Sequence, residues 1–146
     1  MSINPTLGVL ELLQTHGVID SLDPSTPQPA WIGSEGFKPH PDRMVATLIS
    51  GGRDSHPSLN IDWPQVQVLV RGQRGEYSST LAKAREVKSA LLGLANLSIG
   101  GELWASVRLI GDISPAGVDE NNRDLFSMNY ELIIHTDDLG NRAEIF

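Results

Sequence analysis

The chain has 146 residues, a formal net charge of −7 and no cysteine. Its length suits one domain with a single hydrophobic core, and we expect residues 1–146 to form one. Without cysteine, disulfides, thiolate catalysis and Cys-based zinc sites are excluded. The excess of carboxylates repels phosphate backbones, so no specific nucleic-acid binding is expected.

A first helix is predicted over residues 4–17. Asn4 can accept a hydrogen bond from a backbone amide at the helix start, and Pro5 suits the first helical position. The leucines that follow recur at about the helical period. Gly17 is predicted to end the helix, because glycine adopts positive φ without a Cβ clash.

Residues 20–42 contain five prolines and few apolar residues. Proline fixes φ and removes a backbone donor, so we expect an extended, partly polyproline-like arm. The arm is either a solvated linker or a segment that docks on a surface through Trp31.

Two strands and a helix are predicted in the middle of the chain. Residues 43–50 and 63–72 have strand composition, and Val66, Val68 and Val70 fall on one face of the second strand. The connection between them opens with two glycines. Residues 78–97 show an apolar stripe at helical spacing with charged residues opposite, which predicts an amphipathic helix.

The last predicted element is a hairpin. Asn121 and Asn122 suit a type I′ turn, which needs two residues at positive φ. This turn sets Leu109 opposite Ile134, and it also sets Asp112 unfavourably opposite Glu131. Pro115 cannot donate to the ladder, so a bulge is predicted near residues 114–115.

These elements follow the order α-β-β-α-β-β. The predicted fold is therefore of the α/β (α+β) class, with about four strands in a largely antiparallel sheet. Two helices are expected to pack on one face of that sheet.

No pattern in the sequence indicates a catalytic residue, a cofactor site or a metal site. The four histidines lack metal-ligand spacing. The stretch "GGRDSHPS" lacks a nucleophile elbow, and "DENNRD", residues 119–124, lacks the spacing of a calcium loop. The longest uncharged helical stretch, residues 89–101, is too short to span a bilayer, so no membrane partner is expected. We therefore expect a protein that is not an enzyme.

An ordered series of segments resembles one protein family. The series is "HPDRMVATLISGG", then "VQVLVRG" with Tyr77 and an Ala-rich helix, then "LIGDISPAGVDENNRDLFSMNYEL". It is similar to the minor capsid and tail-terminator (tail-completion) proteins of long-tailed bacteriophages. The resemblance spans roughly residues 30–135. Its most specific part is the acidic pair, the turn and Arg123, followed by Phe126 and Asn129 before an aromatic residue, Tyr130.

The resemblance implies structural work in the virion. Such proteins form a ring, usually of six copies, that caps the tail tube, stops its elongation and offers a surface to the head connector. The implied partners are further copies of the chain, the tail-tube protein and the head–tail connector protein. The implied location is the head–tail junction, after assembly in the host cytoplasm.

A closed ring needs one patch on a subunit to meet a different patch on the next. The candidate contact residues are Trp31 of the arm, Arg71 at the end of a strand, and Asp119, Glu120 and Arg123 of the hairpin tip. One hypothesis is that Glu120 and Arg123 pair with charges across the ring, and the alternative is that they only solvate the turn. Two other functions stay open: a neck, head-completion or other tail structural protein, and a small ligand-binding regulatory module.

Overall fold

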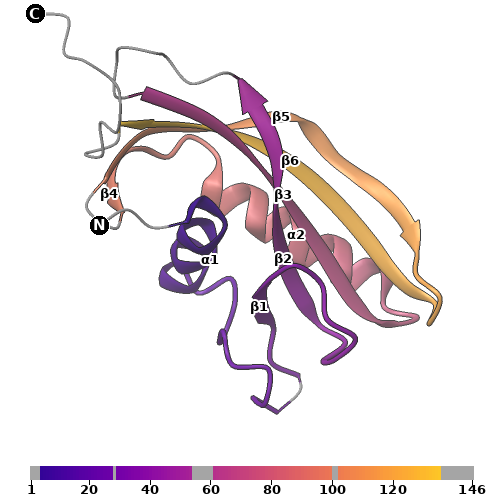
Figure 1. Ribbon diagram of the computed structural model, residues 1–146. Coiled ribbons are helices and arrows are strands. Elements are labelled where there is room, and N and C mark those ends of the chain that lie inside the picture. The colour runs from indigo at the N-terminus through magenta and orange to yellow at the C-terminus, as the bar shows by residue number, and fades with distance from the viewer. Residues whose placement is uncertain (1–3, 28, 54–60, 100–101, 136–146) are drawn as a thin grey trace, which may run out of the picture.

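The computed structural model of the chain describes residues 4–27, 29–53, 61–99 and 102–135. Six strands form one curled sheet in the order β1-β2-β3-β6-β5-β4, and both helices pack on the same face of it (Figure 1). Strand β1 is parallel to β2, and the other neighbours are antiparallel. The elements are α1 (Pro5–Thr15), β1 (Ile32–Glu35), β2 (Met44–Arg53), β3 (Ile61–Arg74), α2 (Tyr77–Leu91), β4 (Ala95–Ile99), β5 (Glu102–Val118) and β6 (Arg123–His135).

The predicted count of about four strands is wrong, because β1 lies inside the Pro-rich arm. Its four residues pair in register with residues 44–47 of β2. Gly33 permits this passage, because a Cβ there would lie 2.5 Å from Ile19 Cδ1. A strand of this length between prolines shows too little alternation to be detected from sequence.

The second missing strand, β4, lies where the sequence predicts the end of the long helix. Helix α2 ends at Leu91 rather than at residue 97. Gly93 and Asn96 then adopt positive φ, 78° and 56°, which a right-handed helix does not allow. The leucines in this stretch continue the apolar pattern, so periodicity alone conceals where the helix ends.

The β5–β6 hairpin turns through a three-residue loop of Glu120, Asn121 and Asn122, not through the predicted two-residue turn. The amide of Asn122 donates to the carbonyl of Asp119 at 3.0 Å, and the amide of Asp119 donates to the carbonyl of Arg123 at 3.0 Å. Within this loop only Asn122 has positive φ, 59°. A left-handed last residue is typical of three-residue hairpin loops.

Bulges then shift the register of the hairpin. The predicted irregularity near Ser114–Pro115 is confirmed, since the register shifts on both sides of this dipeptide. As a result Leu109 faces Tyr130 rather than Ile134. Glu131 faces Arg108 rather than Asp112. The bulges thus replace a repulsive carboxylate pair with an attractive one.

The hydrophobic core lies between the helices and one face of the sheet. Val66, Val68 and Val70 are all buried there, as their alternation predicts. The start of α1 also follows the prediction, because the Asn4 side chain accepts from the Thr6 amide at 3.2 Å. The largest buried side chain, Trp104 of β5, packs directly against α1 at Gly8.

We predict that Gly8→Ala destabilises the protein, although glycine-to-alanine changes inside helices usually stabilise by up to about 1 kcal/mol. An added Cβ would lie 2.5 Å from Trp104 Cζ2. Overpacking of this kind costs about 1–3 kcal/mol. Denaturant unfolding should show this loss, while Gln14→Ala on the exposed side of α1 stays near neutral. A Gly8→Ala variant as stable as the native chain would contradict this packing.

Candidate functional site

The sheet face opposite the helices, which we call the outer face, is the one turned to the viewer in Figure 1, where β2 and β3 cross in front of α2. Because strand residues alternate between faces, the neighbours of the buried valines point outward. One outward row crosses four strands and consists of Leu48, Gln67, Asn129 and Ile110. No helix in the described part of the chain covers this face.

Arg71 fastens the end of the arm onto the outer face. Its guanidinium Nη2 donates to the carbonyls of Lys38 and Pro41, each at 2.7 Å, and Nε donates to that of Asp42 at 3.1 Å. The guanidinium carbon Cζ also lies over the Phe37 ring, 4.8 Å from the ring centroid. Arg71 is only 3% exposed, and burial lowers its pKa. The arm segment 37–42 is therefore held by a buried cation.

Arg123 holds the same arm segment from the hairpin side. Its Nη1 donates to the carbonyl of Pro39 and to the carboxylate of Asp42, both at 2.9 Å. Its Nε donates to the Asp119 carboxylate at 2.7 Å. That carboxylate also accepts the amides of Asn121 and Arg123. Burial acts to raise the pKa of Asp119, but these hydrogen bonds outweigh it and lower the pKa below its usual value.

Trp31 holds the middle of the arm against the body of the same chain. The guanidinium of Arg43 lies 5.9 Å from the ring centroid, and Lys83 Nζ of α2 lies 5.3 Å from it. The Trp31 amide donates to the Asp20 carboxylate at 2.8 Å. The arm is thus docked, and its Trp31 ring lies within 6 Å of two cations.

The structure therefore brings together three of the five candidate contact residues. Arg71, Asp119 and Arg123 meet around the arm segment 37–42, and Glu120 is exposed beside them at the hairpin tip. Trp31 anchors a different part of the arm. Arg71 and Arg123 donate their hydrogen bonds to groups of the same subunit, so they hold the arm segment 37–42 and the hairpin tip in place. Their role in contacts between subunits stays a prediction.

Sequence reasoning missed a second cluster, at the centre of the outer face. Glu131 of β6 is 3% exposed and accepts from Arg53 Nε at 3.0 Å and from Arg108 Nη2 at 3.1 Å. The hydrogen bonds from Arg53, followed by those from Arg108, hold the pKa of Glu131 at about 2. The side chains of the two arginines are 60% and 61% exposed. A correct hairpin register would have revealed the pairing of Glu131 with Arg108.

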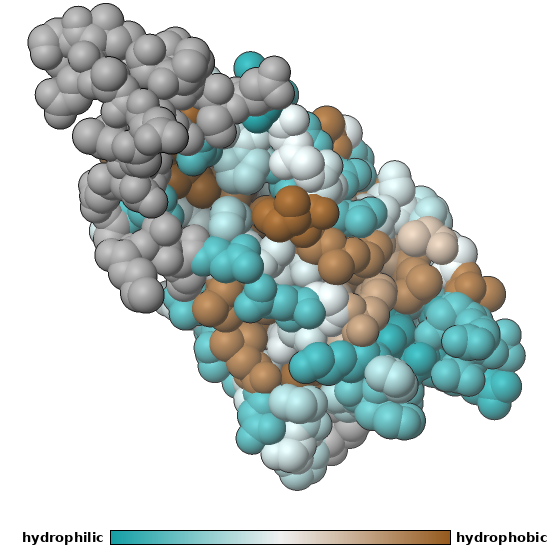
Figure 2. All heavy atoms as spheres, viewed as in Figure 1, coloured by the Kyte–Doolittle hydropathy of each residue, from teal (hydrophilic) through white to brown (hydrophobic). Residues whose placement is uncertain are grey.

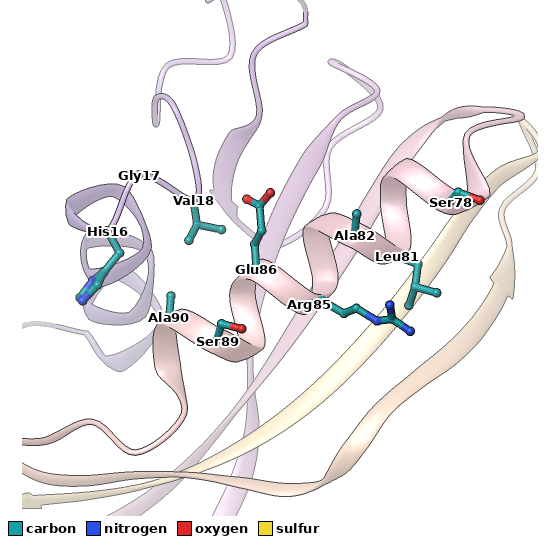
Figure 3. A pocket seen from close by; sticks show the side chains of 10 residues that line it. All are labelled: His16, Gly17, Val18, Ser78, Leu81, Ala82, Arg85, Glu86, Ser89 and Ala90. Atoms are coloured by element: carbon teal, nitrogen blue, oxygen red, sulfur yellow. The ribbon is translucent and has the colours of Figure 1, made fainter.

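An open groove of about 690 Å³ runs along α2 beside the end of α1 (Figure 3). A small-molecule site would need polar groups that converge in it. Figure 3 instead shows Arg85 and Glu86 pointing to opposite sides of the helix, and His16 points away from both. The groove does not have the geometry of a ligand pocket.

The described ranges contain no cluster of three or more His, Asp or Glu that could hold a metal ion. Neither α1 nor α2 is long and apolar enough to cross a membrane. Most of the "GGRDSHPS" stretch, namely residues 54–58, lies outside the described residues.

We predict that Arg71→Met loosens the arm. The change keeps the apolar stem but leaves three partly buried carbonyls without their donor, which costs about 2–4 kcal/mol in total. Denaturant unfolding measures the loss, and hydrogen exchange should accelerate at residues 37–42. Arg85→Met, at an exposed arginine of α2, is the control and should change stability by less than about 0.5 kcal/mol. Equal stability of the two variants would refute the fastening role.

A second prediction concerns pH. The folded-state pKa of Glu131, about 2, lies below its ordinary value of 4.5, so ionised Glu131 stabilises the fold at neutral pH. That stabilisation is fully present above pH 4.5 and is lost as the pH falls toward 2. Glu131→Gln should therefore cost about 1–3 kcal/mol at pH 7, and the difference from the native chain should shrink toward pH 3. Glu86→Gln, at an exposed carboxylate of α2, is the control and should change stability at pH 7 by less than about 0.5 kcal/mol.

Comparison with known proteins now bears on function. The family model described as "Bacteriophage tail terminator protein" matches residues 37–136. A comparison with curated proteins gives no match. Among solved structures, the chain resembles one in the "Virion of native gene transfer agent (GTA) particle", with a TM-score of 0.63 and 12% identity. That match covers 90% of this chain and 95% of the other, and it shows a shared fold. Because the family model spans most of the sequence, the chain belongs to the bacteriophage tail terminator family and is a structural protein of the phage tail.

Proposed function

We propose that the chain assembles into a ring that caps the tail tube, stops further tube subunits from adding, and offers a surface for head joining. The observation that carries this proposal is the family match over residues 37–136. Six copies per ring is the number that the resemblance implies. The partners are then other copies of the chain, the tail-tube protein and the head–tail connector protein, at the head–tail junction of the virion.

The geometry of the subunit supports a role based on contacts. Among the described residues, helices cover one face of the sheet only, so the part of the outer face that the arm leaves uncovered supports contact with another protein. The hairpin tip and the arm segment 37–42 form a rigid end, because two buried arginines tie them together. Rigid protruding ends on a fixed scaffold are where recognition residues commonly lie.

The five candidate residues take two roles in this proposal. Glu120 is exposed and has no ion-pair partner among the described residues, so it is available to a neighbouring subunit. Asp119 and Arg123 hold its loop, Arg71 holds the adjacent arm, and Trp31 seats the arm on α2. The charge pairing across the ring is therefore assigned to Glu120, while Arg123 pairs inside its own subunit.

Electron microscopy of particles made without this protein tests the function. We expect tails of uncontrolled length or heads without tails, and a supplied native gene should restore normal particles. Normal infectious particles in its absence would overturn the proposal. Supplying Glu120→Arg instead tests the tip, since fully restored particles would limit Glu120 to solvating the turn.

A further inference from the structure

The outer face differs in charge from the rest of this acidic chain. Among the described strand residues that point outward, Glu131 is the only carboxylate, and it is buried beneath Arg53 and Arg108. Asp112, at a bulge of β5, does not point outward, because it pairs with Lys88 of α2 at 2.8 Å. The exposed charge of these outward strand residues is therefore positive, although the chain as a whole carries −7.

The outer face is also partly apolar. Leu48 is 37% exposed, and Leu69, Ile110 and Ile133 are partly exposed on neighbouring strands. Figure 2, in the same view as Figure 1, shows apolar side chains gathered in a diagonal band across these strands toward the hairpin tip. A contiguous apolar patch with charged groups beside it is typical of a protein-binding surface.

The opposite side of the molecule has the complementary charge. Residues 4–36 contain no lysine or arginine. They contain four exposed carboxylates, none of which forms an ion pair with a described residue. Helix α1 packs on the helix-covered face, so this acidic side points away from the outer face. The four carboxylates of the acidic side belong to Glu11, Asp20, Asp23 and Glu35.

We propose that the outer face of one copy binds the acidic side of a second copy. This inference rests on the proposed ring and names its contact. The two surfaces are different patches on opposite layers of the subunit, so the contact is head-to-tail, the type that generates a ring when its rotation closes. Arg53 and Arg108 can each donate to a second carboxylate while keeping the hydrogen bonds to Glu131, since a guanidinium has five N–H donors. The apolar band supplies the buried area.

A nucleic acid fits this face less well than a second copy does. The net charge of −7 opposes the approach of a phosphate backbone, whereas the local arginines sit beside leucine and isoleucine side chains that phosphates cannot use. A protein surface that offers carboxylates and apolar stems satisfies both features.

The test adds negative charge to the outer face without changing its shape. In Gln65→Glu/Gln67→Glu two outward amides of β3 become carboxylates. Sedimentation of the purified full chain, from about 1 µM to 1 mM, should show self-association of the native protein and a rise of about tenfold or more in the dissociation constant of the variant. Circular dichroism and unfolding midpoints verify that the variant is folded.

The matched control places a new carboxylate on the acidic side. Gln14→Glu, on the exposed side of α1, should leave self-association unchanged or tighten it. Glu11→Lys should weaken it, and Glu11→Lys combined with Gln65→Glu/Gln67→Glu should recover part of the loss. Mixing experiments should show the same reciprocity between two differently labelled variants.

Three results would overturn the proposal. The first is a native chain that stays monomeric to about 1 mM. The second is a Gln65→Glu/Gln67→Glu variant that associates like the native chain. The third is that this variant loses DNA binding while its self-association is unchanged. The contact and the proposed function fail separately. Particles with normal tails in the absence of the protein count against tail capping, whereas sedimentation alone decides the contact.

Discussion

The arrangement of the arm depends on the buried guanidinium of Arg71. Removing a charged group from water costs several kcal/mol, and only full hydrogen bonding offsets that cost. Three arm carbonyls supply the hydrogen bonds, and the Phe37 ring covers the planar group. A lysine could not replace it, because one ammonium lacks the planar fork that reaches several carbonyls at once. The path of residues 37–42 thus depends strongly on the chemistry of one side chain on β3.

Arg123 holds the hairpin to the arm in the same way, through hydrogen bonds from a buried guanidinium. Its bonds to Pro39, Asp42 and Asp119 link the arm, the loop and the start of β6. The carboxylates of Asp42 and Asp119 balance the charges that Arg71 and Arg123 bring into this partly buried region. The acidic run at residues 119–124 is therefore partly a structural clasp, and Glu120 is the member that remains turned to solvent.

Sequence patterns predicted what depends on local chemistry. The cap at Asn4, the buried valines of β3, both helices and the bulge at Ser114–Pro115 were all readable from residue type and spacing. Strands β1 and β4 were not, since each is short and owes its structure to pairing with a distant partner. The predicted hairpin register was wrong for a related reason, because each bulge shifts the pairing partner of every residue beyond it.

The candidate site divides in the same way. Trp31, Arg71, Asp119, Glu120 and Arg123 stood out by residue type, but spacing could not show that the arm would fold back onto two of these arginines. The cluster of Arg53, Arg108 and Glu131 joins β2 to the β5–β6 hairpin, which lies far from β2 in sequence. Only the observed register brings these three side chains together.

One consequence follows from the unequal lengths of the two last neighbours in the sheet. Strand β4 has 5 residues and β5 has 17, so β4 pairs with only the beginning of β5 and leaves the rest of β5 as an edge strand. A long unpaired edge strand is ordinarily a template on which strands of other molecules pair and form fibrils. The bulges and Pro115 bend this edge and interrupt its series of backbone N–H donors. Addition of further strands to the free edge of β5 is thereby disfavoured. Assembly through the faces of the sheet then avoids fibril formation.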